Sequence, residues 1–256
     1  MKIFVVFGST SDHETYEPLK KDLAAVGEVE FDVISAHRNL EELQARLKAL
    51  DSDVIIAGAG LAAALPGVCA SIVDKPVFGV SVAAHFGGLD ALASIAQMPF
   101  GMPVLTSGSG QEKSIADFLA LYNAKGDVAK LHFVISDWVC DSDFAKKELD
   151  RAQKVAEEHG WSTTTGNAVD NDAFNIVYVT QDEDIKTDAL AVHVPLFSPE
   201  DIKKPENYMV IYNWAQRGGL WVGANNSRNA VLAANRLFKN EESDHGTAGN
   251  TISRVG

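Results

Sequence analysis

The sequence has few cysteines, a shortage of basic residues and no long apolar run. Its 256 residues include only two cysteines, Cys69 and Cys140, which are too few for a disulfide framework and lack metal-ligand spacing. Lys and Arg number 22 against 35 Asp and Glu, which gives a formal net charge of −13. Because an acidic chain repels phosphate backbones, a nucleic-acid partner is disfavoured.

The apolar stretches are also short. Ile3–Phe7 near the N-terminus is too short for a signal peptide. No stretch approaches the roughly 20 apolar residues of a membrane span. We therefore expect a cytoplasmic protein that has no membrane partner.

Short apolar segments alternate with amphipathic segments along the chain, and hydrophobic residues make up 46% of it. Continuous apolar runs are typical of strands buried on both faces, so the alternation predicts an α/β fold with a doubly wound parallel sheet. The predicted strands cover 3–7, 30–34, 53–57, 76–80, 102–106, 132–135, 176–179, 190–194 and 220–222. The predicted helices cover 14–25, 41–50, a small-residue segment ending at 70, 89–96, 113–122, 142–159, 209–216 and 229–238.

A polar stretch at 123–130 separates two such series, which predicts two tandem related halves. We place the first half at 1–126, the second at 130–239 and a disordered tail at 240–256. Phe4–Val6 aligns with Phe133–Ile135, and the same alignment sets Asp12 opposite Asp141. The alternative, that any two α/β halves align loosely, stays open.

In a parallel sheet, the loops that follow the carboxyl ends of the strands share one edge, and ligands bind there. The first such loop, Gly8–Asp12, leads into a predicted helix. Gly8 allows a tight turn, and the hydroxyls of Ser9 and Ser11 lie at the positive end of that helix, which suits a phosphate. An ionised Asp12 only accepts hydrogen bonds and suits sugar hydroxyls. Simple capping of the helix by Ser11 and Asp12 is the alternative.

The second loop is Ser35-Ala36-His37-Arg38. The planar guanidinium of Arg38 can bind a phosphate through two parallel hydrogen bonds. His37 can exchange protons near neutral pH, and an adjacent cation helps to keep its imidazole neutral. A histidine–arginine pair that is merely exposed at the start of a helix is the other interpretation.

The third loop is rich in small residues and runs through Gly58, Ala59, Gly60 and Leu65. Its glycine spacing superficially fits a dinucleotide-binding motif, but no acidic residue follows at the expected distance. We expect instead that the small side chains let the backbone approach a flat ligand closely within a cramped apolar pocket. No histidine pair has the spacing of a metal site, and we interpret His132, His159, His193 and His245 as structural or solvated.

Taken in order, these loops resemble the family of N5-carboxyaminoimidazole ribonucleotide mutases and aminoimidazole ribonucleotide carboxylases, the PurE family. The resemblance is carried by Gly8-Ser9-Thr10-Ser11-Asp12, Ser35-Ala36-His37-Arg38, Ala57-Gly58-Ala59-Gly60 with Leu65-Pro66-Gly67, and Leu92-Ala93-Ser94-Ile95-Ala96-Gln97-Met98-Pro99. It covers the first half. In the second half only Asn229–Ala234 is similar to the family's terminal helix.

The resemblance implies a flavodoxin-like three-layer fold, an oligomer and a reaction without ATP, metal or organic cofactor. It implies that His37 is the acid/base, that Ser9, Ser11 and Asp12 bind the ribotide, and that Arg38 binds its phosphate. The remaining motif residues, Gly8, Ser35, Ala36, Gly58, Ala59, Gly60 and Leu65, are expected to shape the site. The implied reaction moves a carboxyl group on aminoimidazole ribonucleotide, with carbon dioxide held in the site, in de novo purine biosynthesis.

Of the places where the sequence departs from the family, two bear on the substrate. Ala64 stands where the family often has histidine, and Ser81 replaces the proline of a Gly-Val-Pro-Val motif. A related carboxylase or decarboxylase for another heteroaromatic substrate is therefore an alternative, as is a non-catalytic nucleotide-binding protein. The second half lacks the His-Arg motif, so we expect it to have no chemistry of its own. The resemblance implies an octamer of single halves, and four chains of two halves each could imitate that octamer.

Overall fold

The computed structural model describes residues 1–238, so the predicted tail at 240–256 lies outside the described residues. The strands are β1 (Lys2–Phe7), β2 (Glu28–Val33), β3 (Val54–Ala59), β4 (Val77–Ser81), β5 (Leu105–Ser107), β6 (Lys130–Val134), β7 (Ser162–Gly166), β8 (Phe174–Val179), β9 (Ala191–Pro195) and β10 (Leu220–Trp221). The helices are α1 (His13–Leu23), α2 (Leu40–Lys48), α3 (Leu65–Ile72), α4 (Leu89–Ala96), α5 (Lys113–Lys125), α6 (Asp137–Cys140), α7 (Asp143–Glu158), α8 (Glu206–Ala215) and α9 (Ser227–Phe238). Short 3₁₀ turns are η1 (Thr10–Asp12), η2 (Phe86–Gly88), η3 (Asp182–Asp184) and η4 (Asp201–Lys203).

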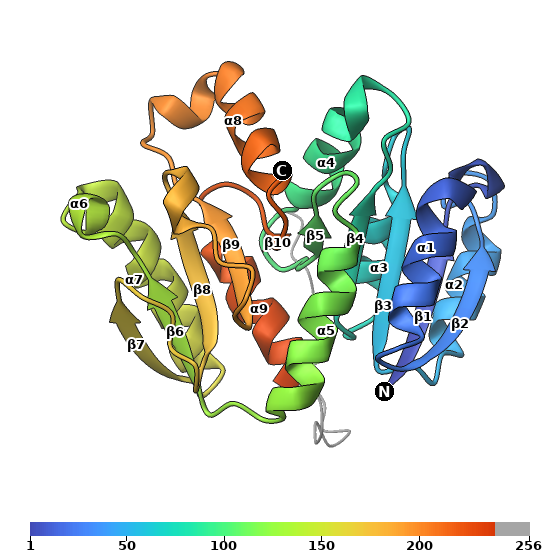
Figure 1. Cartoon of the computed structure of the whole chain (residues 1–256), viewed down its shortest axis with the longest axis horizontal. Helices are drawn as coiled ribbons and strands as arrows, with labels where there is room; N and C mark the ends of the chain where they lie inside the picture. The colour runs from blue at the N-terminus through green and yellow to red at the C-terminus, as the bar shows by residue number, and fades with distance from the viewer. Residues whose placement is uncertain (239–256) are drawn as a thin grey trace, which may run out of the picture.

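All the strands join one ten-stranded sheet in the order β2-β1-β3-β4-β5-β10-β9-β8-β6-β7 (Figure 1). Each half contributes five neighbouring strands in the same relative order, second-first-third-fourth-fifth. Every pairing is parallel except that of β5 with β10, where the halves meet. The predicted α/β fold class is thus confirmed, although the sheet is mixed rather than wholly parallel.

The junction between the halves has a local two-fold arrangement. Trp221 pairs with Thr106 across the antiparallel junction. The two residues are equivalent, because Thr106 pairs with Gly79 in the first half as Trp221 pairs with His193 in the second. The pair therefore marks an internal pseudo-two-fold axis that relates the two sets of five strands.

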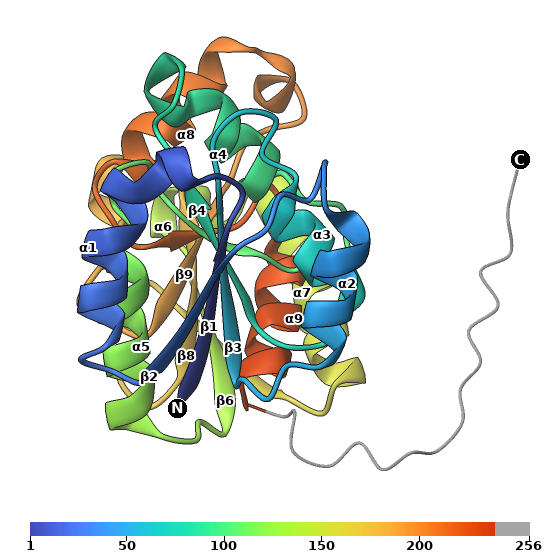
Figure 2. The ribbon, with the colours of Figure 1, turned by 90° about the vertical axis from the view of Figure 1, so that its right-hand side faces the viewer.

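The apolar core lies on both faces of this sheet. One face carries a continuous cluster that includes side chains of α1, α5, α7 and α9 from both halves. The opposite face carries a cluster under α2 and α3 and another between α4 and α8. Figure 2 shows α1 and α5 on one side of β1 and β3, with α2 and α3 on the other. The helices cover the two faces of the sheet, so the edge at which the strands end is formed by loops.

The second half is simpler than the first. The chain passes from β7 to β8 without a helix, and from β8 to β9 with only η3. Strand β7 was not predicted, because its sequence Ser-Thr-Thr-Thr-Gly is polar and the strand lies at the edge of the sheet.

The sequence alignment of the two halves is wrong by one residue. Phe4 faces the cluster under α2 and α3, whereas Phe133 faces the cluster shared by both halves. Because side chains alternate between the two faces of a strand, Phe4 cannot correspond to Phe133. Val5 corresponds to Phe133 instead, and Ile3 corresponds to Leu131. The strand register agrees, since Ile3 pairs with the first residue of β3 and Leu131 with the first residue of β8.

Within residues 1–238, every helix is too short or too polar to span a lipid bilayer.

Candidate active site

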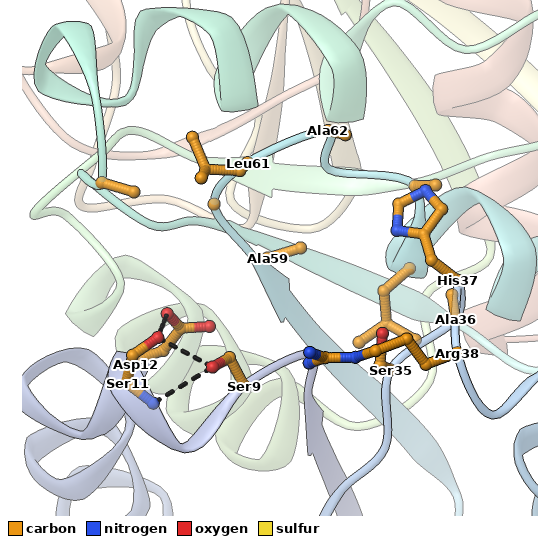
Figure 3. A pocket seen from close by; sticks show the side chains of 15 residues that line it. Ser9, Ser11, Asp12, Ser35, Ala36, His37, Arg38, Ala59, Leu61 and Ala62 are labelled. Carbon is orange, nitrogen blue, oxygen red and sulfur yellow. Dashed lines mark hydrogen bonds between the residues drawn. The ribbon is translucent and has the colours of Figure 1, made fainter.

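A cavity of about 430 Å³ opens at the carboxyl ends of β1, β2 and β3 (Figure 3). The three loops predicted to carry the site form most of its wall, together with one residue after β4. The lining residues are Gly8, Ser9, Ser11, Asp12, Ser35, Ala36, His37, Arg38, Ala59, Gly60, Leu61, Ala62, Ala64, Leu65 and Ala84. The structure therefore brings all the predicted site residues except Gly58 to one cavity.

The first loop forms the turn η1 and then α1. The Ser9 hydroxyl accepts a hydrogen bond from the backbone N–H of Ser11 at 3.2 Å, so Ser9 caps this turn. Asp12 occupies the cap position of α1 but makes no side-chain capping bond. It accepts one hydrogen bond from the Ser11 hydroxyl at 3.2 Å. Capping therefore explains Ser9, whereas the Asp12 carboxylate keeps acceptor capacity on the cavity side.

Burial raises the pKa of the Asp12 carboxyl, because partial removal from water disfavours the charged form. The hydrogen bond from Ser11 acts in the opposite direction and is the smaller effect. A ligand that donates hydrogen bonds to Asp12 would stabilise its ionised form.

The second loop presents His37 and Arg38 as exposed side chains. In the described part of the chain, neither side chain has a hydrogen-bond or ion-pair partner. Figure 3 shows the guanidinium of Arg38 extending toward Ser9, while the His37 ring lies on the side of Ala62. The cation and the imidazole thus face two different regions of the same cavity.

The third loop supplies a wall of small apolar side chains. Gly60 allows close approach, since a Cβ atom there would lie 2.9 Å from the Cβ of Ala84. Gly58 has a different role from the one expected, because it does not line the cavity. A Cβ atom at Gly58 would overlap the ring of Phe7, so this glycine serves the packing of β3 against the core.

Sequence reasoning predicted the third loop as a pocket wall but did not name Leu61, Ala62 or Ala64 individually, and it did not assign Ala84 to the site. The first three belong to the third loop and could have been included with their neighbours. Ala84 follows β4, whose carboxyl end lies on the same sheet edge, so the edge rule itself could have pointed to this residue.

Among the histidines outside the cavity, His193 has a structural role, whereas His245 lies outside the described residues. His193 is fully buried, and its Nε2 accepts from the backbone N–H of Lys186 at 3.0 Å while Nδ1 contacts the carbonyl of Leu220 at 2.9 Å. Burial lowers the pKa of His193 to about 4. Both cysteines are free, and burial raises the pKa of Cys69 to about 12. Among residues 1–238 no group of three or more His, Cys, Asp or Glu side chains could hold a metal ion.

The fold and the cavity define a doubly wound α/β protein with a candidate ligand site at the carboxyl edge of the sheet, next to the switch in strand order. The chain belongs to the AIR carboxylase family, whose model matches residues 2–127. The match ends between α5 and β6, so it covers the half that contains the cavity.

Two relatives compared by sequence agree with this assignment. The chain is 46% identical over 115 residues to the N5-carboxyaminoimidazole ribonucleotide mutase of Methanocaldococcus jannaschii, covering 44% of this chain and 73% of the relative. It is 36% identical over 166 residues to the enzyme of the same name from Pyrococcus horikoshii, covering 61% of this chain and 89% of the relative. The crystal structure of Treponema denticola PurE matches 61% of this chain and 95% of its own at 25% identity, with a TM-score of 0.43.

Proposed function

We propose that this protein transfers a carboxyl group on aminoimidazole ribonucleotide, converting N5-carboxyaminoimidazole ribonucleotide into the 4-carboxy isomer. The observation that carries the proposal is the convergence of His37, Arg38 and the Ser9–Asp12 turn on one cavity. The relatives that match this half are named N5-carboxyaminoimidazole ribonucleotide mutases, which supports the same reaction here.

His37 is the proposed acid and base. The bond between the exocyclic nitrogen and the carboxyl carbon breaks, carbon dioxide leaves, and His37 supplies the proton that the nitrogen gains. The ring carbon then forms a bond to the carbon dioxide and returns its proton to His37. One imidazole can serve both transfers because the same ring can donate and accept a proton, and His37 is the only histidine among the residues that line the cavity.

Arg38 and the first loop are proposed to hold the ribotide. The Arg38 guanidinium is exposed and unpaired in the described structure, so a phosphate can form two parallel hydrogen bonds with it. Asp12 keeps its acceptor oxygens for ribose hydroxyls, and Ser9 and Ser11 add hydroxyl groups beside it. These contacts act far from the reacting atoms and fix the position of the ring.

The small-residue wall is proposed to retain carbon dioxide between the two bond changes. Ala59, Gly60, Ala62 and Ala64 offer no side-chain donor or acceptor that would hold water against the ring. A close-fitting apolar wall therefore favours recapture of the gas over its escape.

The direct test is an isomerisation assay with the wild-type protein and the His37→Asn variant in parallel. We expect the wild type to interconvert the two carboxyaminoimidazole ribonucleotides and the variant to lose most of this activity. A folded wild-type protein that does not interconvert them would reject the proposed function.

A second candidate is a carboxylase or decarboxylase that acts on a related heteroaromatic acid. The observation that favours it is Ala64, which lines the cavity at the position where the family often has histidine. The isomerisation assay separates the two candidates, because an enzyme for another heteroaromatic acid should leave both carboxyaminoimidazole ribonucleotides unchanged.

We also propose the assignment of 1–126 as the catalytic half and 130–239 as a related half without chemistry. The shared strand order and the pseudo-two-fold pairing of Thr106 with Trp221 support a common origin of the halves. The chain is further proposed to form a tetramer that imitates an octamer of single halves. Light scattering should then give four times the chain mass of 27.5 kDa, and a monomeric mass would reject this assembly.

A further inference from the structure

The segment after β4 forms one wall of the cavity and has an unusual backbone. Ala84 lines the cavity directly against Gly60. Beyond it, Phe86, Gly87 and Gly88 have φ values of 48°, 65° and 83°. Residues with positive φ are disfavoured unless they are glycine, and a phenylalanine in this region persists only when its surroundings hold it there.

Contacts with other residues of the first half do little to hold the backbone of Phe86, Gly87 and Gly88 in this conformation. Gly88 donates its N–H to the carbonyl of His85 at 2.7 Å, which closes a tight turn. The Phe86 side chain is 81% exposed, so packing of its ring does not fix the turn. Ser109 reaches the carbonyl of Gly88 with a long hydrogen bond of 3.3 Å.

The second half supplies a hydrogen bond to this segment that is shorter than the one from Ser109. Tyr212 on α8 donates its hydroxyl to the carbonyl of Gly87 at 2.8 Å. The ring of Tyr212 packs against the apolar cluster between α4 and α8, which limits where the hydroxyl can go. A Cβ atom at Gly87 would lie 2.8 Å from this hydroxyl oxygen, so glycine is needed for the close approach as well as for the positive φ.

We propose that Tyr212 is a positioning residue for the cavity, through which the second half holds the wall formed by Ala84. The proposal rests on the proposed function, since it assigns the second half a part in substrate binding. Tyr212 does not line the cavity, and it acts through the carbonyl of Gly87 and the turn that leads back to Ala84. Losing this contact should loosen the wall and weaken binding, while the reacting groups at His37 stay in place.

The chain offers a matched control on the same helix. Tyr208 lies one turn before Tyr212 on α8, and among the described residues its buried hydroxyl has no hydrogen-bond partner. Tyr208→Phe and Tyr212→Phe therefore remove the same atom from the same helix. Only Tyr212→Phe removes a contact with the cavity wall.

The experiment compares the two variants with the wild type in the isomerisation assay and in amide hydrogen exchange. For Tyr212→Phe we expect KM to rise roughly three- to tenfold, the change that follows from losing one ordinary hydrogen bond, with kcat nearly unchanged. Exchange at the N–H groups of Ala84 and Gly88 should accelerate. Tyr208→Phe should leave all three quantities at the wild-type values.

Three outcomes would overturn the proposal. They are unchanged KM in Tyr212→Phe, unchanged exchange at Ala84 and Gly88, and equal effects in Tyr208→Phe, which would indicate a general loss of helix stability. A wild type without isomerase activity rejects the proposed function instead. In that case the exchange measurement still decides whether Tyr212 holds the segment.

Discussion

The hydroxyl of Ser136 donates a hydrogen bond of 2.5 Å to the carboxylate of Asp184, which connects the ends of β6 and β8 in the second half. The same carboxylate accepts from the backbone N–H and the hydroxyl of Thr180 at 2.8 and 2.7 Å. By the strand register, Gly8 in the first half is equivalent to Ser136, and Gly60 is equivalent to Thr180.

The two halves of the sheet therefore differ in the side chains at the ends of their strands. In the first half the strand ends carry glycines that line the cavity. In the second half, hydroxyl side chains at the same positions are engaged by an internal carboxylate. The arrangement supports the proposal that only the first half has chemistry.

Replacing His37 should affect rate more than binding. We expect His37→Asn to lower kcat by about 10²- to 10⁴-fold, the usual contribution of a general acid or base, with substrate affinity largely retained. His13→Asn is the control, because His13 is exposed nearby on α1 but does not line the cavity. Steady-state kinetics check both variants, and a small effect of His37→Asn would contradict its role.

Replacing Arg38 should affect binding more than rate. Arg38→Ala removes the proposed phosphate contact and should raise KM by about ten- to a hundredfold, in line with the loss of charge-assisted hydrogen bonds. Lys48→Ala removes an exposed cation from the end of α2 and serves as the control. An unchanged KM in Arg38→Ala would show that the phosphate binds elsewhere.

Two glycines should respond in opposite ways to alanine. Gly58→Ala forces a methyl group into the ring of Phe7 and should cost about 1–3 kcal/mol of unfolding free energy, as overpacking does. At Gly8 the nearest atom to an added Cβ is 4.0 Å away, so Gly8→Ala should keep the stability and weaken ligand binding. Denaturant unfolding and ligand titration of both variants measure these effects, and the reverse pattern would refute the assignment.

His193 should make stability fall in mild acid. Burial lowers its pKa to about 4 in the folded protein, whereas an unfolded histidine titrates near 6.5. Between these values the unfolded chain binds the extra proton, so stability is lost as the pH falls from 6.5 toward 4. The loss attributable to this residue between pH 7 and 5 is about 2 kcal/mol.

The matching measurement is denaturant unfolding of wild type, His193→Gln and His85→Gln at both pH values. His193→Gln should show a smaller drop between pH 7 and 5, because glutamine does not titrate. His85→Gln, at an exposed histidine, should follow the wild type. An equal drop in all three proteins would mean that His193 does not govern this pH response.

The fold class and most elements could be predicted because burial leaves a clear pattern in the sequence. The run Ile3–Phe7 is apolar throughout since both faces of β1 are covered, and the structure confirms a strand there. Strand β7 was not predicted, because an edge strand can form without a run of apolar residues. The alignment of the halves went wrong by one residue, because neighbouring apolar residues such as Phe4 and Val5 do not reveal which face each occupies.

The sequence by itself determined which residue types stand at the ends of the strands, and with them His37, Arg38 and Asp12, because parallel strands bring their carboxyl ends to one edge. Tertiary structure decided the rest. Only packing shows that Gly58 serves the core beneath Phe7 and that Tyr212 of the second half reaches Gly87. Such contacts join residues far apart in the chain, and their geometry depends on how the two halves meet across the sheet.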